Sequence, residues 1–214
     1  MFEETDTNLL LLINGAHTPF LDQLMWVVSE RLVWVPFYLV TLFVIWRNNG
    51  WRGVFELLVL VGMMMLMTDA FNSQVIRPWI HRLRPCHPDN PISGMVHLVR
   101  EHRSMSCSCP SAHAANFCGL SLLIAYFIRS RRVLCYMLAF TLLVCYSRAY
   151  MGLHYPGDLL AGMLYATLVV GALLFVYRRW RRPCFEQRSR MEWIPGLALL
   201  VTLSVMAVWA LLTI

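Results

Sequence analysis

The chain has 214 residues, of which 58% are hydrophobic and only 14% are charged. About a quarter of the residues in a soluble domain are charged, so this composition argues against an ordinary soluble protein. The formal net charge is +6, and every basic residue is an arginine. Attraction to anionic lipid headgroups and membrane topology would each account for that excess.

The first thirty residues contain no complete membrane span. Glu3, Glu4 and Asp6 make the start acidic, and no basic n-region is present, so no cleavable signal peptide is expected. The apolar stretch 8–13 is too short to cross a bilayer. Residues 20–30 mix apolar and polar side chains, and we predict that they form a short interfacial helix leading into the first span.

Six apolar runs follow that are almost free of charge. They cover residues 32–46, 54–70, 114–128, 133–146, 159–177 and 194–214. A spanning helix needs roughly 20 apolar residues, and shorter cores suffice where flanking side chains snorkel. We therefore predict an all-α, polytopic membrane helical bundle with about six transmembrane helices, in which residues 1–214 form one domain. These runs disfavour the alternative of a soluble bundle with buried helices.

Arginines in the connections predict the orientation. Three connections are basic: the first-to-second with Arg47 and Arg52, the third-to-fourth with Arg129, Arg131 and Arg132, and the fifth-to-sixth with Arg178, Arg179, Arg181, Arg182, Arg188 and Arg190. The positive-inside rule places them in the cytoplasm, which leaves both termini and the other two connections outside. The second-to-third connection is also basic, with Arg77, Arg82, Arg84, Arg100 and Arg103. We discount it because three of these arginines are close to the site predicted below.

A pair of arginines follows the second span. Arg77 is followed, after six residues, by Arg84 and Pro85. Seven positions are about two helical turns, so the arginines could share a face, although Pro78 can kink the helix between them. Asp69 lies eight residues before Arg77 inside an apolar run, where an ionisable residue indicates function. We predict that Asp69 holds Arg77 or another site arginine in place.

Residues 77–110 form the longest connection, which we expect to be an outer loop with a functional role. The loop contains Cys86, Cys107 and Cys109. In an oxidising compartment, a disulfide from Cys86 to Cys107 or Cys109 would pin the loop over the site. Free thiols are an equally good alternative.

The third span opens with Pro110, Ser111, Ala112 and His113. Ser111 is a natural N-cap, and the free N–H groups of a helix start can bind an anion. His113 lies in that first turn and could donate a proton to an oxygen leaving phosphorus. Capping alone would also explain Ser111, and four residues are a weak motif by themselves.

The most specific pattern joins the fourth and fifth spans. Ser147 and Arg148 are followed after five residues by His154 and after three more by Asp158. Residues four apart share a helical face, so Asp158 could bond one imidazole nitrogen and leave the other free to attack. Arg148 can offer a planar fork to phosphate oxygens. Taken singly, His154 could be an interfacial polar residue and Asp158 a helix-start residue.

Jointly, the three patterns resemble the type 2 phosphatidic acid phosphatases, membrane lipid phosphatases related to vanadium haloperoxidases. That family has Lys, six residues, Arg-Pro; then Pro-Ser-Gly-His; then Ser-Arg, five residues, His, three residues, Asp. The resemblance covers residues 69–162 and keeps every spacing, with Arg77 in place of Lys and Ala112 in place of Gly.

The resemblance implies a role for each matching residue. His154 would attack phosphorus to form a phosphohistidine, Asp158 would orient it, and His113 would protonate the leaving oxygen. The residues implied to neutralise the equatorial oxygens are Arg77, Arg84, Ser111 and Arg148. No acidic metal cluster is visible in the sequence, so we expect no metal and no cofactor, with arginines in the place of Mg²⁺.

These observations predict an integral phosphatase of a bacterial cytoplasmic membrane, with its site on the periplasmic or exterior face. The expected substrates are polyprenyl diphosphate, phosphatidylglycerol phosphate or phosphatidate, and the phosphates of lipid A, which the sequence does not rank. Expected partners are this substrate and membrane lipids, not nucleic acid, and the oligomeric state stays open. Two alternatives are a transporter, against which the clustering of charge at one face argues, and a catalytically silent lipid-phosphate-binding protein.

Overall fold

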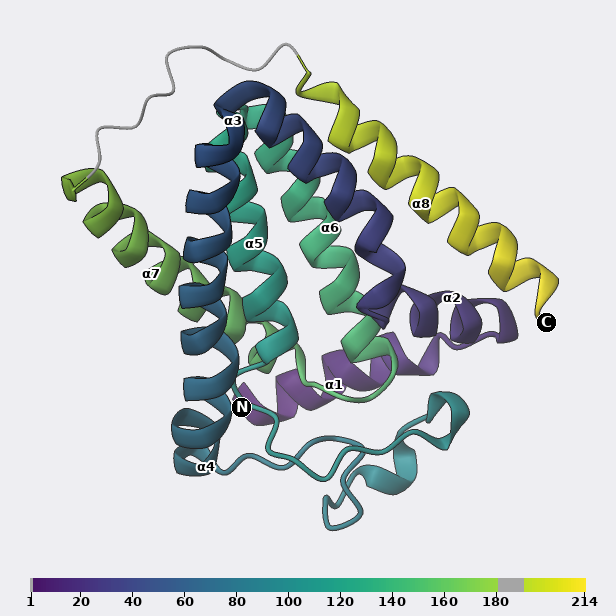
Figure 1. The fold of residues 1–214 in the computed structure, drawn as a ribbon. Helices are drawn as coiled ribbons and strands as arrows, with labels where there is room; N and C mark the ends of the chain where they lie inside the picture. Colours follow the sequence, from purple (N-terminus) through teal and green to yellow (C-terminus); the bar gives the residue numbers. More distant parts are fainter. Residues whose placement is uncertain (1, 181–190) are drawn as a thin grey trace.

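The structure is a computed structural model that describes residues 2–180 and 191–214, and in these ranges it is all-α, as predicted (Figure 1). Arg181, Arg182, Arg188 and Arg190 of the predicted basic connection lie outside the described residues. The helices are α1 (Phe2–Gly15), α2 (Pro19–Ser29), α3 (Val35–Met65), α4 (Arg77–Ile80), α5 (Ala112–Ile128), α6 (Arg131–Tyr150), α7 (Pro156–Trp180) and α8 (Trp193–Leu212). A π-helical segment, Leu66–Ile76, joins α3 to α4, and single 3₁₀ turns occupy Leu32–Trp34, Ser93–Met95 and Val99–Glu101.

Helix α3 consists of two arms that meet at Gly50. Gly50 has φ 65° and ψ −174°, a conformation that glycine adopts without a Cβ penalty. In Figure 1 the chain rises along the first arm, turns at the top of the view and descends along the second arm to α4. The predicted first and second spans are these two arms, so the connection between them is a kink rather than a loop.

The helices have the length and composition of membrane spans. Four helical stretches are long and apolar enough to cross a bilayer: Leu32–Ile80, Arg131–Tyr150, Pro156–Trp180 and Trp193–Leu212. Helix α5 is a shorter apolar helix. Each predicted apolar run falls in one of these helices or in one arm of α3. Large apolar side chains such as Leu168 and Phe175, each 74% exposed, cover their outer surfaces, as expected where lipid is the solvent.

Helix α5 is the centre of the bundle and packs against α3, α6 and α7. A helix that is apolar on all sides is stable only when it is surrounded, and most residues of α5 are buried. Phe117 of α5 packs edge-on against Phe140 of α6, with the ring centroids 5.4 Å apart. This packing fixes the start of α5, which carries Ser111 and His113.

Two short helices cover one end of the bundle. Helix α2 is the predicted interfacial helix, capped by Thr18, whose side chain accepts from the Leu21 N–H. Helix α1 was not predicted. Leu10 of α1 is fully buried, and α1 packs against α6 and α7. The Asn14 side chain donates to the carbonyls of Tyr150, at 2.7 Å, and His97, at 2.9 Å, so α1 also holds the outer loop.

The outer loop lies across this same end of the bundle (Figure 1). Cys86 is buried, Cys107 and Cys109 are partly exposed, and all three are free thiols in this structure. The structure therefore has the free thiols rather than a disulfide from Cys86 to Cys107 or Cys109. Backbone contacts hold the loop instead: Cys86 N–H donates to Gly152 O at 3.1 Å, and Ser108 N–H donates to Arg82 O at 2.8 Å.

Candidate active site

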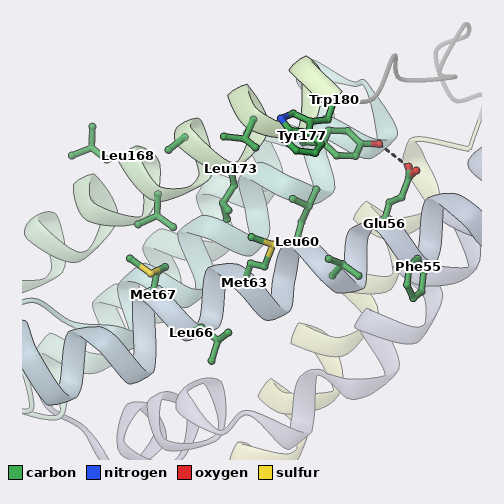
Figure 2. A pocket seen from close by; sticks show the side chains of 14 residues that line it. Phe55, Glu56, Leu60, Met63, Leu66, Met67, Leu168, Leu173, Tyr177 and Trp180 are labelled. Carbon is green, nitrogen blue, oxygen red and sulfur yellow. Dashed lines mark hydrogen bonds between the residues drawn. The ribbon is translucent and has the colours of Figure 1, made fainter.

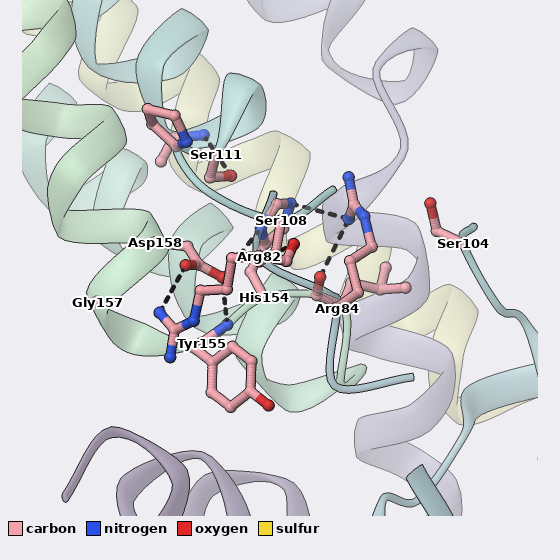
Figure 3. Close-up of polar contacts among 12 residues, drawn as sticks. Arg82, Arg84, Ser104, Ser108, Ser111, His154, Tyr155, Gly157 and Asp158 are labelled. Carbon is pink, nitrogen blue, oxygen red and sulfur yellow. Dashed lines mark hydrogen bonds and ion pairs between the residues drawn. The ribbon is translucent and has the colours of Figure 1, made fainter. Parts of the chain in front are cut away.

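The three sequence patterns meet at one end of the bundle, where α6 ends, α5 and α7 begin, and the outer loop crosses (Figure 3). His154 stands at the centre, in the turn between α6 and α7, and is fully buried. Arg84 comes from the loop, Ser111 from the cap of α5, and Asp158 from the first turn of α7. Segments far apart in the chain therefore contribute to a single buried cluster of polar side chains.

His154 is held by Arg84. The Arg84 Nη1 group lies 3.0 Å from His154 Nε2 and also donates to the carbonyl of Leu153 at 3.0 Å. A guanidinium has only donors, so Nε2 must accept and the neutral ring carries its proton on Nδ1. Burial lowers the pKa of His154 well below its ordinary value, and the charges of Arg84, Arg148 and Arg77 lower it further. The imidazole is therefore neutral, with its lone pair on Nε2.

Asp158 is close to His154 but is bonded elsewhere. Its Oδ2 lies 3.8 Å from His154 Nδ1, which is too long for a hydrogen bond. That oxygen accepts from the Tyr155 N–H at 3.0 Å, and Oδ1 accepts from Arg82 at 2.8 Å. In this structure the predicted carboxylate–imidazole bond is thus a near approach, and Asp158 is fixed by Arg82.

Arg82 is a site residue that the sequence patterns did not indicate. Its two terminal nitrogens donate to Asp158 Oδ1 and to Asp6 Oδ2 of α1, each at 2.8 Å. Its guanidinium lies over the Tyr155 ring, 4.0 Å from the centroid. Burial lowers the pKa of Arg82, but Asp158 and Asp6 outweigh burial and raise it above its ordinary value. Asp6 also accepts from the Gly157 N–H at 2.7 Å, so α1 caps the start of α7.

The predicted phosphate-binding arginines surround His154 from three elements. The Nε of Arg77 donates to the carbonyl of Pro110 at 2.9 Å, and the Nε of Arg84 donates to the carbonyl of Ser106 at 3.0 Å. Arg148 donates to Ser29 Oγ at 2.6 Å, and its buried Nε has no hydrogen-bond partner within the described ranges. Burial and the charge of Arg77 lower the pKa of Arg84 to about 10, so it stays protonated at neutral pH.

The guanidinium groups of the three predicted phosphate-binding arginines donate to carbonyl and hydroxyl oxygens rather than to carboxylates. Of Arg77, Arg84 and Arg148, none forms an ion pair with an acidic residue in the part of the chain that the structure describes. Clustered cations without counterions are costly in a buried place unless an anion completes them. The cluster is therefore suited to an anion with several oxygens, such as a phosphoryl group.

The start of α5 adjoins this cluster. Ser111 is fully buried, its Oγ accepts from the Ala114 N–H at 3.4 Å, and its own N–H donates to the carbonyl of Asp158 at 3.0 Å. A Cβ at Gly162 would lie 2.4 Å from the carbonyl of Ser111, so glycine is what lets α7 approach the cap of α5. His113 and Arg148 line one polar cavity of about 440 Å³.

Asp69 makes no direct contact with this cluster, although its charge is near enough to act on Arg77. It lies on the π-helical segment, is partly exposed, and forms no ion pair with any arginine of the described chain. The hydrogen bond that holds the Arg77 side chain goes to the carbonyl of Pro110. The role of Asp69 stays a prediction. The described residues contain no group of three or more His, Cys, Asp or Glu side chains placed to hold a metal ion.

A helical membrane bundle that gathers guanidinium groups around a neutral imidazole has the features of a membrane protein that binds phosphoryl groups. Known proteins define the family. Residues 56–184 match the sequence profile of the PAP2 superfamily. A lipid A 4'-phosphatase of Bacteroides thetaiotaomicron is 35% identical over 161 residues, 75% of this chain and 72% of that protein. Phosphatidylglycerophosphatase B of Bacillus subtilis is 31% identical over 137 residues, 60% of this chain and 57% of that protein.

A solved structure supports the fold. The crystal structure of a transmembrane PAP2-type phosphatidylglycerolphosphate phosphatase from Bacillus subtilis superposes with a TM-score of 0.63 at 21% identity, covering 85% of this chain and 88% of that one. The chain belongs to the PAP2 superfamily, and it is a lipid phosphatase of the membrane.

Proposed function

We propose that this phosphatase removes a phosphate from the saccharide headgroup of a lipid A-type lipid, through a phosphohistidine on His154. The choice of substrate rests on the 35% identity to a lipid A 4'-phosphatase over 75% of this chain. A second lipid A 4'-phosphatase, from Porphyromonas gingivalis, is 28% identical over 82% of this chain. The geometry around His154 supports the mechanism.

The first step transfers the phosphoryl group to the protein. The substrate phosphate replaces His154 Nε2 as the acceptor for Arg84, which frees the nitrogen lone pair. Nε2 then attacks phosphorus and the bond from phosphorus to the lipid oxygen breaks. His113, which takes up a proton when the phosphate anion binds beside it and offsets the neighbouring arginines, gives this proton to that oxygen. Arg77, Arg84, Arg148 and the N–H groups at the cap of α5 neutralise the charge that builds up on the other three oxygens.

The second step returns the enzyme to its starting state. Water attacks the phosphorus of the phosphohistidine, His113, now neutral, takes a proton from it, and the bond from Nε2 to phosphorus breaks. Phosphate leaves, His113 is protonated again, and Nε2 can accept from Arg84 once more. Asp158, held by Arg82 beside Nδ1, stabilises the positive charge that the His154 ring carries while it is phosphorylated.

We further propose that the site faces the periplasm or cell exterior from a bacterial cytoplasmic membrane. The placement of the arginine-bearing connections supports this orientation. The arginine-bearing kink of α3 and the α5–α6 connection lie at one end of the bundle, and the outer loop with α1 and α2 lies at the other (Figure 1). Arginine-rich connections stay in the cytoplasm, which leaves the site on the opposite side.

A second substrate class is favoured by one relative. Undecaprenyl-diphosphatase BcrC of Bacillus subtilis is 33% identical over 92 residues, 43% of this chain. A polyprenyl diphosphate would present the same terminal phosphoryl group to His154, but its leaving group would be a phosphate rather than a sugar hydroxyl.

A phosphate-release panel separates these substrates. The purified protein would be assayed with lipid A, phosphatidylglycerol phosphate, phosphatidate and undecaprenyl diphosphate. The variant His154→Ala and a control variant at an exposed surface residue, Asp89→Asn, would be assayed in parallel. We expect the highest kcat/KM for lipid A, a loss of at least about a thousandfold in His154→Ala, and an unchanged Asp89→Asn. Preference for another headgroup would replace the proposed substrate, and full activity in His154→Ala would remove the proposed nucleophile.

A further inference from the structure

An apolar cavity of about 260 Å³ opens between the two arms of α3 and the central helix α5. We call it the tail cavity. Its apolar wall includes Tyr38 and Leu42 from the first arm, Leu57 and Val61 from the second arm, and Phe117 and Leu120 from α5. The inference about it rests on the proposed function, in particular on His113 as the proton donor.

The mouth of the tail cavity is polar and is shared with the site. Arg31 and His113 line the tail cavity, and both also line the polar cavity of about 440 Å³ that Arg148 and Ser29 border. The two cavities therefore meet at His113. One side of this residue faces the polar cavity, whose charged lining is Arg31, Arg148 and Glu30, and the other faces the apolar side chains of the tail cavity.

The chemistry fixes which part of a substrate lies at that mouth. In an in-line displacement the nucleophile and the leaving oxygen are on opposite sides of phosphorus. His154 occupies one side, so the leaving oxygen must face the residue that protonates it, which is His113. The lipid body is attached to this oxygen, and it begins where the tail cavity begins. We propose that a hydrocarbon chain of the lipid substrate is bound in the tail cavity while its phosphate is bound by the arginines.

A larger apolar groove competes for this role but is in the wrong place. It measures about 850 Å³ and runs between the second arm of α3 and the far half of α7, from Leu168 to Trp180 (Figure 2). None of the proposed site residues lines it. Its polar end is occupied by Tyr177, which donates to Glu56 at 2.6 Å. Because α7 begins beside His154 and ends at Trp180, this groove lies toward the opposite end of the bundle.

Filling each cavity in turn tests the proposal. Val61 lines the tail cavity and Val169 lines the larger groove, and both side chains are partly buried, so Val61→Trp and Val169→Trp are a matched pair. The readout is kcat/KM for alkyl phosphates from butyl to hexadecyl, which share one headgroup. We expect Val61→Trp to cut the gain from butyl to hexadecyl phosphate by about tenfold or more, while butyl phosphate turnover and the Val169→Trp variant stay at the wild-type level.

Three outcomes would contradict binding of the hydrocarbon chain in the tail cavity. The rise in kcat/KM from butyl to hexadecyl phosphate could be unchanged in Val61→Trp, or it could be reduced equally in Val169→Trp. The third outcome is loss of butyl phosphate turnover in a folded Val61→Trp. A wild-type protein that releases no phosphate from any lipid would instead contradict the proposed function.

Crosslinking gives a readout that needs neither turnover nor a folded tryptophan variant. His154→Ala would be irradiated with a hexadecyl phosphate carrying a diazirine near the chain end, and the labelled peptides would be mapped by mass spectrometry. Label on 38–42 and 117–124, which line the tail cavity and not the larger groove, supports the proposal when it is lost on competition with hexadecyl phosphate. Label confined to 168–180 would place the chain in the larger groove and contradict it.

Discussion

At the scale of single residues, the chemistry depends on the protonation state of His154. The ring is fully buried, and Arg84 lies 3.0 Å from Nε2. A charged imidazole is disfavoured there by burial first and then by the neighbouring guanidinium groups, which is why its pKa lies below 6.5. The nucleophile that we propose must keep its lone pair, and this environment leaves the lone pair on Nε2 without deprotonation by a base.

The same environment makes stability depend on pH. In the unfolded chain a histidine takes up a proton near pH 6.5, whereas folded His154 does not. Below that pH the unfolded state binds more protons, so the free energy of unfolding falls with falling pH, by at most about 1.4 kcal/mol per pH unit. We expect the wild-type thermal midpoint in detergent to fall more steeply between pH 7 and pH 5 than that of His154→Gln. Parallel curves for the two proteins would contradict a depressed pKa at His154.

The sequence predicted which residues meet in the site more reliably than it predicted their partners. The spacing of His154 and Asp158 indicated a direct hydrogen bond, but their nearest nitrogen and oxygen are 3.8 Å apart. Helix α7 begins only at Pro156, so His154 lies before the helix and the i, i+4 geometry of a continuous helix does not apply. Asp158 instead bonds Arg82 and the Tyr155 N–H, and contacts of this long range are invisible to a local spacing argument.

At the scale of the elements, α1 connects the chain start to the site. Asp6 of α1 accepts from Arg82 of the outer loop and from the Gly157 N–H of α7. A Cβ at Gly157 would lie 2.7 Å from Asp6, so the contact depends on this glycine. Arg82 is shared by Asp6 and Asp158, and it therefore fixes α1, the loop and α7 relative to one another.

This network predicts a positioning role for Arg82. We expect Arg82→Gln to lower kcat by about tenfold to a hundredfold with a smaller change in KM, because Asp158 loses its buried counterion and no longer fixes the charge beside His154. Arg82→Lys should restore part of kcat. A double-mutant cycle with Asp6→Asn should give a coupling of about 0.5–3 kcal/mol.

The exposed carboxylate of Asp89, in the same loop, provides the control: Asp89→Asn should leave kcat and the pH profile unchanged. Additive effects of Asp6→Asn and Arg82→Gln, or a loss confined to KM, would contradict the positioning role.

Element prediction succeeded where one helix buries a long apolar run and failed where structure depends on other segments. The run at 8–13 is too short to span, yet it belongs to a full helix because Leu10 packs against α6 and α7. The first and second spans were predicted as separate helices, and the kink at Gly50 joins them. Nothing in the local sequence shows that Asn49 reaches Phe127, to whose carbonyl it donates at 3.1 Å.

At the scale of the whole molecule, the bundle separates two kinds of arginine. Those of the site lie among buried polar groups at one end, and those of the α3 kink and the α5–α6 connection are at the other (Figure 1). The discounting of the basic outer loop in the orientation argument is consistent with this arrangement, because Arg77, Arg82 and Arg84 have buried partners rather than free exposure. Composition and apolar runs were enough to predict the class of fold, since both follow from burial in lipid.

Accessibility labelling tests the proposed orientation. In a protein lacking its native cysteines, Gly94→Cys would lie in the outer loop, where a Cβ meets nothing within 4 Å, and Arg131→Cys would lie at the exposed start of α6. We expect an impermeant maleimide added to intact spheroplasts to label only the first, and to label both after permeabilisation. Labelling of only the second in intact spheroplasts would reverse the topology.

The proposed mechanism is tested most directly by measuring whether His154 carries a covalently bound phosphoryl group during turnover. His113→Gln would be mixed with ³²P-labelled dinitrophenyl phosphate, whose leaving group needs no proton, so that the first step proceeds while the second lacks its base. After an alkaline quench, we expect stoichiometric label on the peptide that contains His154, stable in base and lost in acid, and no label when His154→Ala is added to this variant. The absence of label, or label on any other residue, would contradict a phosphohistidine at His154.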